Sequence, residues 1–182
     1  MTDATRASAD ARWDVPTVEA LRRFTKEPLP LKLTATAPTR TFFRDVFYDT
    51  SDLTLRARGV TCRVRHRSDD RHELSVEVVS EADGEAVVTS AQADVPGGVA
   101  RAALDGNSEP VRLLRAIVNP AAIDPQLELE SEVFERLVSS RSLRPARFAL
   151  DYAIVTVRGA GLSRSFHEIS QLAKYSDDRA EA

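Results

Sequence analysis

Charged and apolar side chains alternate strictly along several short segments, and this limits the possible folds more than any other feature of the sequence. In residues 61–67, Arg63 and Arg65 fall on one face, and Cys62 and Val64 fall on the other. A period of two is the pattern of a β-strand, in which successive side chains point to opposite sides. The same alternation recurs in residues 73–79, 126–138 and 147–157. The chain is therefore expected to be mainly β, with antiparallel strands.

The charged faces of these segments carry both signs. They hold Glu73, Glu77, Glu128, Glu130, Glu132, Arg136, Arg147 and Asp151, besides the two arginines. An antiparallel sheet with one solvated face explains a charged face on any single strand. Mixed signs on four strands also fit a closed barrel, in which inward Arg and Glu line a lumen and offset one another. Spacing alone leaves both architectures open. In the barrel, Arg63, Arg65, Arg136, Arg147 and Asp151 are expected to point into one lumen.

Two helices are expected beside the strands. Residues 16–26 open with a proline at a tolerated first-turn position and place Val18, Leu21 and Phe24 on one helical face. A second helix should begin near Ser108, a typical N-cap residue, and end at residues 119–120. With 182 residues the chain is interpreted as one domain, and residues 1–7 and 175–182 are expected to fray.

Composition excludes several classes of partner. A formal net charge of -3 gives no global attraction to nucleic acid or to anionic lipid, so neither is expected as a partner. No apolar run approaches the roughly 18 residues of a membrane span. Cys62 is the single cysteine, so an intramolecular disulfide cannot form and a cytoplasmic location is expected. Because only three of the 25 basic residues are lysines, an anion site here would be built from guanidinium groups.

Residues 45–65 hold the most specific motif of the chain. An aromatic pair precedes Asp49 and Thr50, then Leu55 and Gly59 follow, and residues 60–65 end in Arg-Val-Arg. This combination resembles the CYTH superfamily, which comprises thiamine triphosphatases, inorganic tri- and polyphosphatases and class IV adenylate cyclases. The resemblance implies a closed eight-stranded antiparallel β tunnel that binds a triphosphate together with Mg²⁺ or Mn²⁺.

The resemblance also implies roles for individual residues. By position in the family pattern, the residues that grip phosphate would be Arg63, Arg65, Arg136 and Arg147. The metal ligands would be Asp94, Glu130, Asp151 and Glu168. The altered first-strand motif would leave Asp10 and Arg12 as its catalytic remnants. The ligand would be a small-molecule triphosphate or polyphosphate, and a homodimer is one possible assembly.

Several family positions are altered in this chain. The first-strand Glu-x-Glu-x-Lys motif corresponds to residues 8–13, where only Asp10 and Arg12 keep charge of the right sign. Glu77 stands where the family has lysine, and Ser170 replaces the second acid of the closing strand. The first hypothesis is a metal-dependent hydrolase that directs water at a terminal phosphate. The alternative is a catalytically degenerate domain that binds a phosphorylated ligand, and a third reading is a module of a longer polyphosphate-handling protein.

Other conspicuous residues are interpreted structurally. The histidines at 66, 72 and 167 are dispersed and lack metal-ligand spacing, so they are expected to be surface or packing residues. Cys62 alternates onto the apolar face of its strand and is expected to be an inert core thiol. Trp13 is expected to cover the core beside the first helix.

Overall fold

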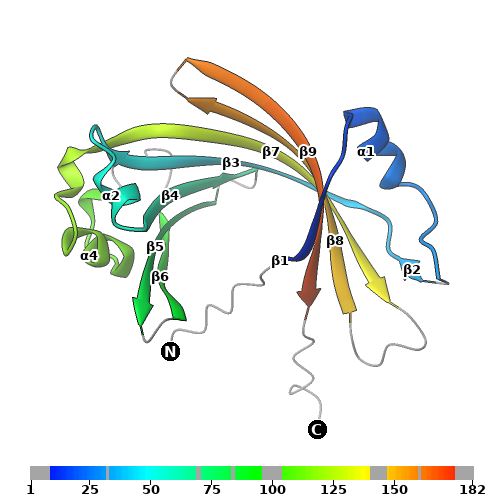
Figure 1. Ribbon diagram of the computed structural model, residues 1–182, viewed down its shortest axis with the longest axis horizontal. Helices are drawn as coiled ribbons and strands as arrows, with labels where there is room; N and C mark the ends of the chain where they lie inside the picture. Colours follow the sequence, from blue (N-terminus) through cyan, green and yellow to red (C-terminus); the bar gives the residue numbers. More distant parts are fainter. Residues whose placement is uncertain are drawn as a thin grey trace, which may run out of the picture. The chain divides into compact units, whose positions relative to one another are not determined.

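The computed structural model describes residues 9–31, 33–68, 71–82, 85–95, 104–139, 147–159 and 161–174 (Figure 1). The predicted fraying of residues 1–7 and 175–182 lies outside these ranges. The strands are β1 (Ala9–Asp14), β2 (Thr34–Ala35), β3 (Thr39–Thr50), β4 (Val60–Arg67), β5 (His72–Ala82), β6 (Glu85–Val95), β7 (Ile123–Ser139), β8 (Arg147–Gly159) and β9 (Leu162–Lys174). The helices are α1 (Val18–Phe24), α2 (Thr54–Ala57), α4 (Glu109–Arg115) and the 3₁₀ turn η1 (Pro120–Ala122).

The strands follow the order β1-β9-β8-β7-β3-β4-β5-β6, and the short β2 pairs with β7 beside this path. Strand pairs β1–β9, β2–β7, β3–β4, β4–β5 and β5–β6 are antiparallel. The mainly antiparallel β class predicted from the alternation is confirmed. The closed tunnel is not confirmed, because the described pairs do not include one that joins β1 to β6. No helix among the described residues is long and apolar enough to cross a membrane.

Contacts divide the chain into two compact units that share long strands. The first comprises Met1–Phe42, Ser131–Thr156 and Ser165–Ala182, and the second comprises Phe43–Glu130 and Val157–Arg164. They are called here the α1 unit and the α4 unit. Strands β3, β7, β8 and β9 each contribute residues to both units. Whether the chain behaves as one domain therefore remains a prediction.

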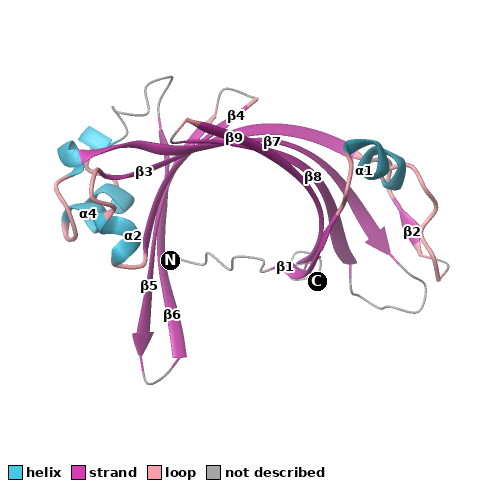
Figure 2. Cartoon of the chain, turned by 45° about the horizontal axis from the view of Figure 1, so that its top comes forward, coloured by secondary structure: helices cyan, strands magenta, loops and turns pink. Residues whose placement is uncertain are grey.

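In the α4 unit, helices α2 and α4 lie beside β4 and β5 (Figures 1 and 2). The core between them takes the apolar faces of the strands, including Val64 and Leu74, and the helix residues Val111 and Leu114. Each such buried Leu or Val contributes about 1.5–3 kcal/mol. Ser108 is the N-cap of α4, as predicted, although the helix ends earlier than expected, at Arg115.

The Asp-Thr part of the motif is a structural turn. The Asp49 carboxylate accepts hydrogen bonds from the backbone N–H groups of Leu55 (2.8 Å) and Arg56 (3.0 Å), which are free donors in the first turn of α2. Leu53 has a φ of 58°, which lets the chain reverse into that helix. The glycine at 59 has a φ of 66°, and a Cβ there would lie 2.8 Å from the Val79 carbonyl oxygen. These residues fix where β4 begins.

In the α1 unit, helix α1 packs on β8 and β9. Thr17 caps the helix by accepting a hydrogen bond from the Ala20 N–H at 3.1 Å, and Leu21 packs against Tyr152 and Ile169. The helix is shorter than the predicted 16–26. It begins at Val18 because Thr17 is the N-cap and Pro16 lies before it, and it ends at Phe24. Trp13, predicted to cover the core beside the first helix, lies at one end of the strand order, opposite Ile169 of that core, and is 49% exposed.

Candidate functional site

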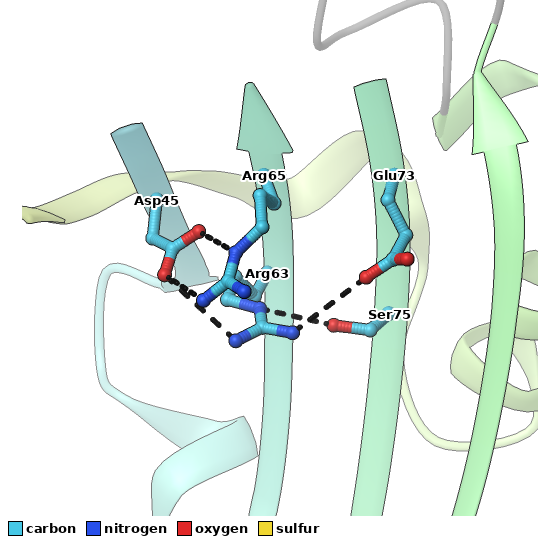
Figure 3. Close-up of polar contacts among 5 residues, drawn as sticks. All are labelled: Asp45, Arg63, Arg65, Glu73 and Ser75. Carbon is cyan, nitrogen blue, oxygen red and sulfur yellow. Dashed lines mark hydrogen bonds and ion pairs between the residues drawn. The ribbon is translucent and has the colours of Figure 1, made fainter. Parts of the chain in front are cut away.

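Arg63, Arg65 and Arg67 of β4 point to the side of the sheet opposite α2 and α4. Arg63 and Arg65 alternate with Cys62 and Val64, which belong to the core beneath the helices. In the antiparallel register, Arg65 lies between Asp45 of β3 and Glu73 of β5, and Arg63 lies between Phe47 and Ser75. Figure 3 shows the five polar members of this group turned toward one another. We call this surface of the α4 unit the arginine face.

Arg65 is bound in a bidentate ion pair. Its Nε and one terminal nitrogen each donate to the Asp45 carboxylate at 2.7 Å, which matches the fork geometry of strong guanidinium pairs (Figure 3). The guanidinium also stacks on the Phe43 ring, 4.1 Å from its centroid. Burial opposes the charge of Arg65, but the hydrogen bonds and charge of Asp45, with the charge of Glu73, raise its pKa overall. Asp45 is itself buried, so each group compensates the other.

Arg63 is held more loosely. Its Nε donates to the Ser75 hydroxyl at 3.2 Å. Its terminal nitrogens lie 3.8 Å from Asp45 and 3.8 Å from Glu73, beyond hydrogen-bond length (Figure 3). Burial and the charge of Arg65 lower the pKa of Arg63, and the carboxylates of Asp45, Glu73 and Glu77 partly oppose them. Arg63 is therefore charged but incompletely neutralised by close contacts.

Two more acids share the arginine face. Glu77 lies opposite Thr61 in β4, and Asp94 lies opposite Glu73 in β6. Residues directly across a strand pair project to the same face. The predicted alternation that puts Glu73, Ser75 and Glu77 on one face is therefore confirmed, and Asp94 projects to the same face as Glu73.

The acidic row of β7 does not lie on this face. Arg44 is next to Asp45 in β3, so its side chain projects to the opposite side of the sheet. There it donates to Glu128 at 2.5 Å. Arg158 of β8 reaches Glu130 at 2.8 Å and lies 4.0 Å from Glu128. The expectation that Glu130 joins the arginines in one lumen is therefore wrong. The charged positions of β4 and those of β7 lie on opposite faces of the sheet. The alternation within each strand cannot reveal this, because it does not say which faces of the two strands correspond.

Arg136 occupies a different environment, in the α1 unit. It is buried, and its guanidinium donates to the backbone carbonyls of Thr36 (3.3 Å) and Glu27 (3.0 Å). It also forms a hydrogen bond with Tyr152, a member of the cluster under α1. Asp151 precedes Tyr152 in β8 and so projects to the other face. Arg136 thus lies on the helix side, and the expectation that it shares a lumen with Asp151 is wrong.

The α1 unit brings together two other predicted residues. Arg12 lies 4.0 Å from Glu168, across the β1–β9 pair. Glu168 and Asp151 both lie next to residues that pack under α1, Ile169 and Tyr152, so both project away from that helix. The backbone of Asp10 is in β1 and that of Arg147 is in β8. The side chains of these two residues lie outside the described part of the chain.

The described residues fit a divalent cation only in part. No three His, Cys, Asp or Glu side chains among them gather into a group that could hold a metal. Mg²⁺ carried by a phosphate ligand needs only one or two protein carboxylates, because phosphate oxygens and waters fill the remaining positions. Glu73 and Asp94, opposite one another in β5 and β6, can supply that number.

The sequence interpretation missed two features of the α4 unit. Asp45 begins the motif in residues 45–65, and its alternation with Val46 was the signal that could have placed it beside the arginines. The histidines are not all dispersed: His66 and His72 face each other across the β4–β5 hairpin, with Nδ1 atoms 3.0 Å apart. Six residues separate them in sequence, so only the hairpin register reveals the contact.

Comparison with known proteins supports the fold. No family model matches the sequence, and no curated protein is detectably similar to it. Among solved structures, a candidate adenylate cyclase from Bacillus halodurans is similar, with a TM-score of 0.58 and 15% identity over 93% of this chain and 81% of that one. A candidate adenylyl cyclase from Hippeastrum, described as having a dominant triphosphatase activity, gives a TM-score of 0.51 and 13% identity over 92% and 80% of the two chains. The chain therefore shares the fold of these two structures.

Proposed function

We propose that this protein binds the phosphate end of a triphosphate or polyphosphate at Arg63 and Arg65. One observation carries the proposal. The two guanidinium groups lie side by side on one face, with side chains only 16% and 21% exposed, and both are aimed at the same carboxylate (Figure 3). Arginine is well suited to phosphate because its planar fork can donate two parallel hydrogen bonds. The similar Hippeastrum protein, whose dominant activity is that of a triphosphatase, makes this ligand class the first to test.

On binding, phosphate oxygens of the ligand would replace the carboxylates of Asp45 and Glu73 as the partners of Arg63. The 3.8 Å separations between Arg63 and its two carboxylates are too long for hydrogen bonds, so a phosphate oxygen at about 2.8 Å would be a better partner. Arg65 would keep its bidentate contact with Asp45, which holds the guanidinium in position. Among the described residues, the arginine face carries four carboxylates (Asp45, Glu73, Glu77 and Asp94) and three arginines (Arg63, Arg65 and Arg67), and this excess of negative charge weakens the attraction of a bare polyanion.

A divalent cation would offset that excess of negative charge. Glu73 and Asp94 are the described residues placed to hold Mg²⁺ or Mn²⁺ beside the arginines. When bound, such an ion neutralises charge on the phosphoryl group. The residues of the chain would orient the phosphate through Arg63 and exclude water through the Phe43 and Phe47 side of the face. Binding is therefore expected to be stronger with Mg²⁺ than with EDTA.

Hydrolysis of the bound triphosphate is the second candidate, and the Glu73–Asp94 pair favours it. Two carboxylates beside a bound phosphate can position both the cation and the attacking water. The competing possibility is a domain that binds the ligand without turnover, because the first-strand motif is altered. Release of inorganic phosphate from tripolyphosphate with Mg²⁺ or Mn²⁺ distinguishes the two, with Asp94→Asn as the variant expected to lose turnover.

A cavity of about 390 Å³ in the same unit could receive the rest of an organic ligand. Its lining is mostly apolar and includes Phe47, Leu53, Thr61, Val79 and Leu127. Phe47 is paired with Arg63, and Thr61 lies two residues before it on the same strand face. A ligand with an apolar or aromatic group next to its phosphates would fill both regions.

Isothermal titration calorimetry with tripolyphosphate, with and without Mg²⁺, tests the proposal. Arg63→Gln is expected to weaken binding at least tenfold, because each charge-assisted contact contributes about 1.5–3 kcal/mol. Arg158→Gln is the matched control, since this arginine lies on the other face and pairs with Glu130. Circular dichroism should show that both variants are folded. Absence of binding by the native chain, or equal affinity of Arg63→Gln and the native chain, would refute the proposal.

A further inference from the structure

The His66–His72 pair lies where β4 ends and β5 begins, at the turn end of the hairpin, on the face opposite Arg63 and Arg65. His66 alternates with Arg65 in β4 and borders the core side of the sheet. The rings meet edge to face, with centroids 4.8 Å apart and an interplanar angle of 67°. Their Nδ1 atoms are 3.0 Å apart. The two nitrogens hydrogen-bond to each other, and the proposed phosphate site does not use them.

The hairpin register explains why the two rings are so close. The Arg67 N–H donates to the Arg71 carbonyl at 2.9 Å, so residues 67 and 71 form a hydrogen-bonded pair. Pairs alternate along an antiparallel ladder, which makes His66 and His72 a non-hydrogen-bonded pair. In such a pair the side chains approach more closely than at any other position of the ladder. The backbone therefore holds both rings together before any ligand arrives.

We infer that His66 and His72 form a chelating pair for a borderline divalent transition metal such as Zn²⁺ or Ni²⁺. Metal–imidazole bonds of 2.0–2.1 Å place two neighbouring ligand nitrogens about 3.3 Å apart in tetrahedral geometry and about 2.8 Å apart in square geometry. The observed 3.0 Å lies between these values. The separation of the two nitrogens therefore suits one ion, which would replace the hydrogen bond between them once the rings turn to direct both lone pairs at it.

The surroundings leave room for the remaining ligands. A cavity of about 470 Å³ opens beside His66 and is bordered by Arg44, Tyr48, Gln126, Glu128 and Arg158. Waters or a small anion in this space could complete the coordination shell. The positive charge of Arg44 is offset by its hydrogen bond to Glu128 at 2.5 Å.

This site differs in chemistry from the proposed phosphate site. Imidazole nitrogen favours zinc, nickel and copper, whereas Mg²⁺ prefers oxygen ligands. The two sites lie on opposite faces of the same strands. Mg²⁺ in excess is therefore expected not to displace Zn²⁺ from the histidines, and tripolyphosphate binding is not required for the metal to bind.

Titration of the full chain with Zn²⁺ and separately with Ni²⁺ tests the inference. One equivalent is expected to bind, and His66→Gln and His72→Gln are each expected to weaken binding at least tenfold. His167→Gln is the matched control, because this third histidine lies in β9 and is expected to leave the affinity unchanged. Glutamine keeps a polar side chain of similar size, and circular dichroism should confirm folding of all three variants.

Nuclear magnetic resonance of the imidazole nitrogens provides a readout that folding effects would not reproduce. Zn²⁺ is expected to shift the Nδ1 signals of both His66 and His72, and to leave those of His167 in place. Affinity that survives both His66→Gln and His72→Gln, or a Zn²⁺-induced shift at His167 alone, would overturn the inference.

Discussion

Arginines in the two units of the chain differ in the groups that accept their hydrogen bonds and ion pairs. Arg63 and Arg65, in the α4 unit, face carboxylates on the side of the sheet away from the helices. Arg136, in the α1 unit, is buried on the helix side and donates to the backbone carbonyls of Glu27 and Thr36. A carboxylate partner can be exchanged for a phosphate, but a buried guanidinium cannot be left without its acceptors at low cost. Arg63 and Arg65 can therefore bind a ligand, whereas Arg136 stabilises the fold.

The largest expected effect concerns Cys62, in the core of the α4 unit. Burial, with the charge of Asp49, raises the pKa of this thiol to about 12. At pH 8 its alkylation by iodoacetamide is expected to be about a thousandfold slower than in the unfolded chain, whose thiol has a pKa of about 8.5. The stability linked to this proton is complete below pH about 8.5 and is lost as the pH rises toward 12.

Cys62 alkylation also tests whether the two units unfold together. Trp13 lies in β1 of the α1 unit, so its fluorescence reports on that unit while the thiol reports on the other. Since four strands contribute to both units, the two probes are expected to give coincident urea transitions, as a single cooperative domain does. Separate midpoints would divide the chain into two domains and contradict the one-domain interpretation.

Replacement of Arg136 by methionine is expected to lower the free energy of unfolding by about 3 kcal/mol, measured by urea denaturation. The variant removes the hydrogen bonds of a buried guanidinium to two backbone carbonyls and to Tyr152, and hydrogen bonds of a charged group contribute about 1.5–3 kcal/mol each. Arg158→Met is the matched control, because its side chain is 54% exposed and such a surface pair is worth about 1 kcal/mol or less. Equal losses in the two variants would mean that Arg136 is not the structural arginine described here.

Asp45→Asn should raise the affinity for tripolyphosphate about tenfold, an effect of about 1.4 kcal/mol. The substitution removes the carboxylate charge that Arg65 holds at 2.7 Å and leaves both arginines with net positive charge. Calorimetry in EDTA measures the change without any contribution from a cation. A lower affinity would show that Asp45 positions the arginines more than it competes for them.

Glu73→Gln is expected to have a smaller effect with a sign that depends on the cation. Its contact with Arg63 is 3.8 Å long, so in EDTA the affinity for tripolyphosphate should rise only a few-fold. Mg²⁺ should raise the tripolyphosphate affinity of this variant less than that of the native chain, because one of the two candidate carboxylates for the cation is gone. A rise of equal size with and without Mg²⁺ would remove Glu73 from the proposed cation site.

Much of the local structure follows from the sequence because its causes are local. The alternation in residues 61–67 gives β4 and places Arg63 and Arg65 together on one face. Ser108 starts α4, and the register of β5 places Glu73 and Glu77 as predicted. The aromatic-Asp-Thr motif identified the fold, and the structure shows its cause: Asp49 caps α2 through two backbone N–H groups.

Only the tertiary structure decided which faces meet. Alternation assigns two faces to each strand but does not say which face of β7 joins which face of β4, because a slip of one residue exchanges them. The pairing of Arg44 with Glu128 placed the β7 acids opposite the arginine face, and α1 covered the face of Arg136. The contact between His66 and His72 likewise depends on the ladder position set by the hairpin. Residue type and spacing determined the strands and the arginine pair, while long-range register determined their partners.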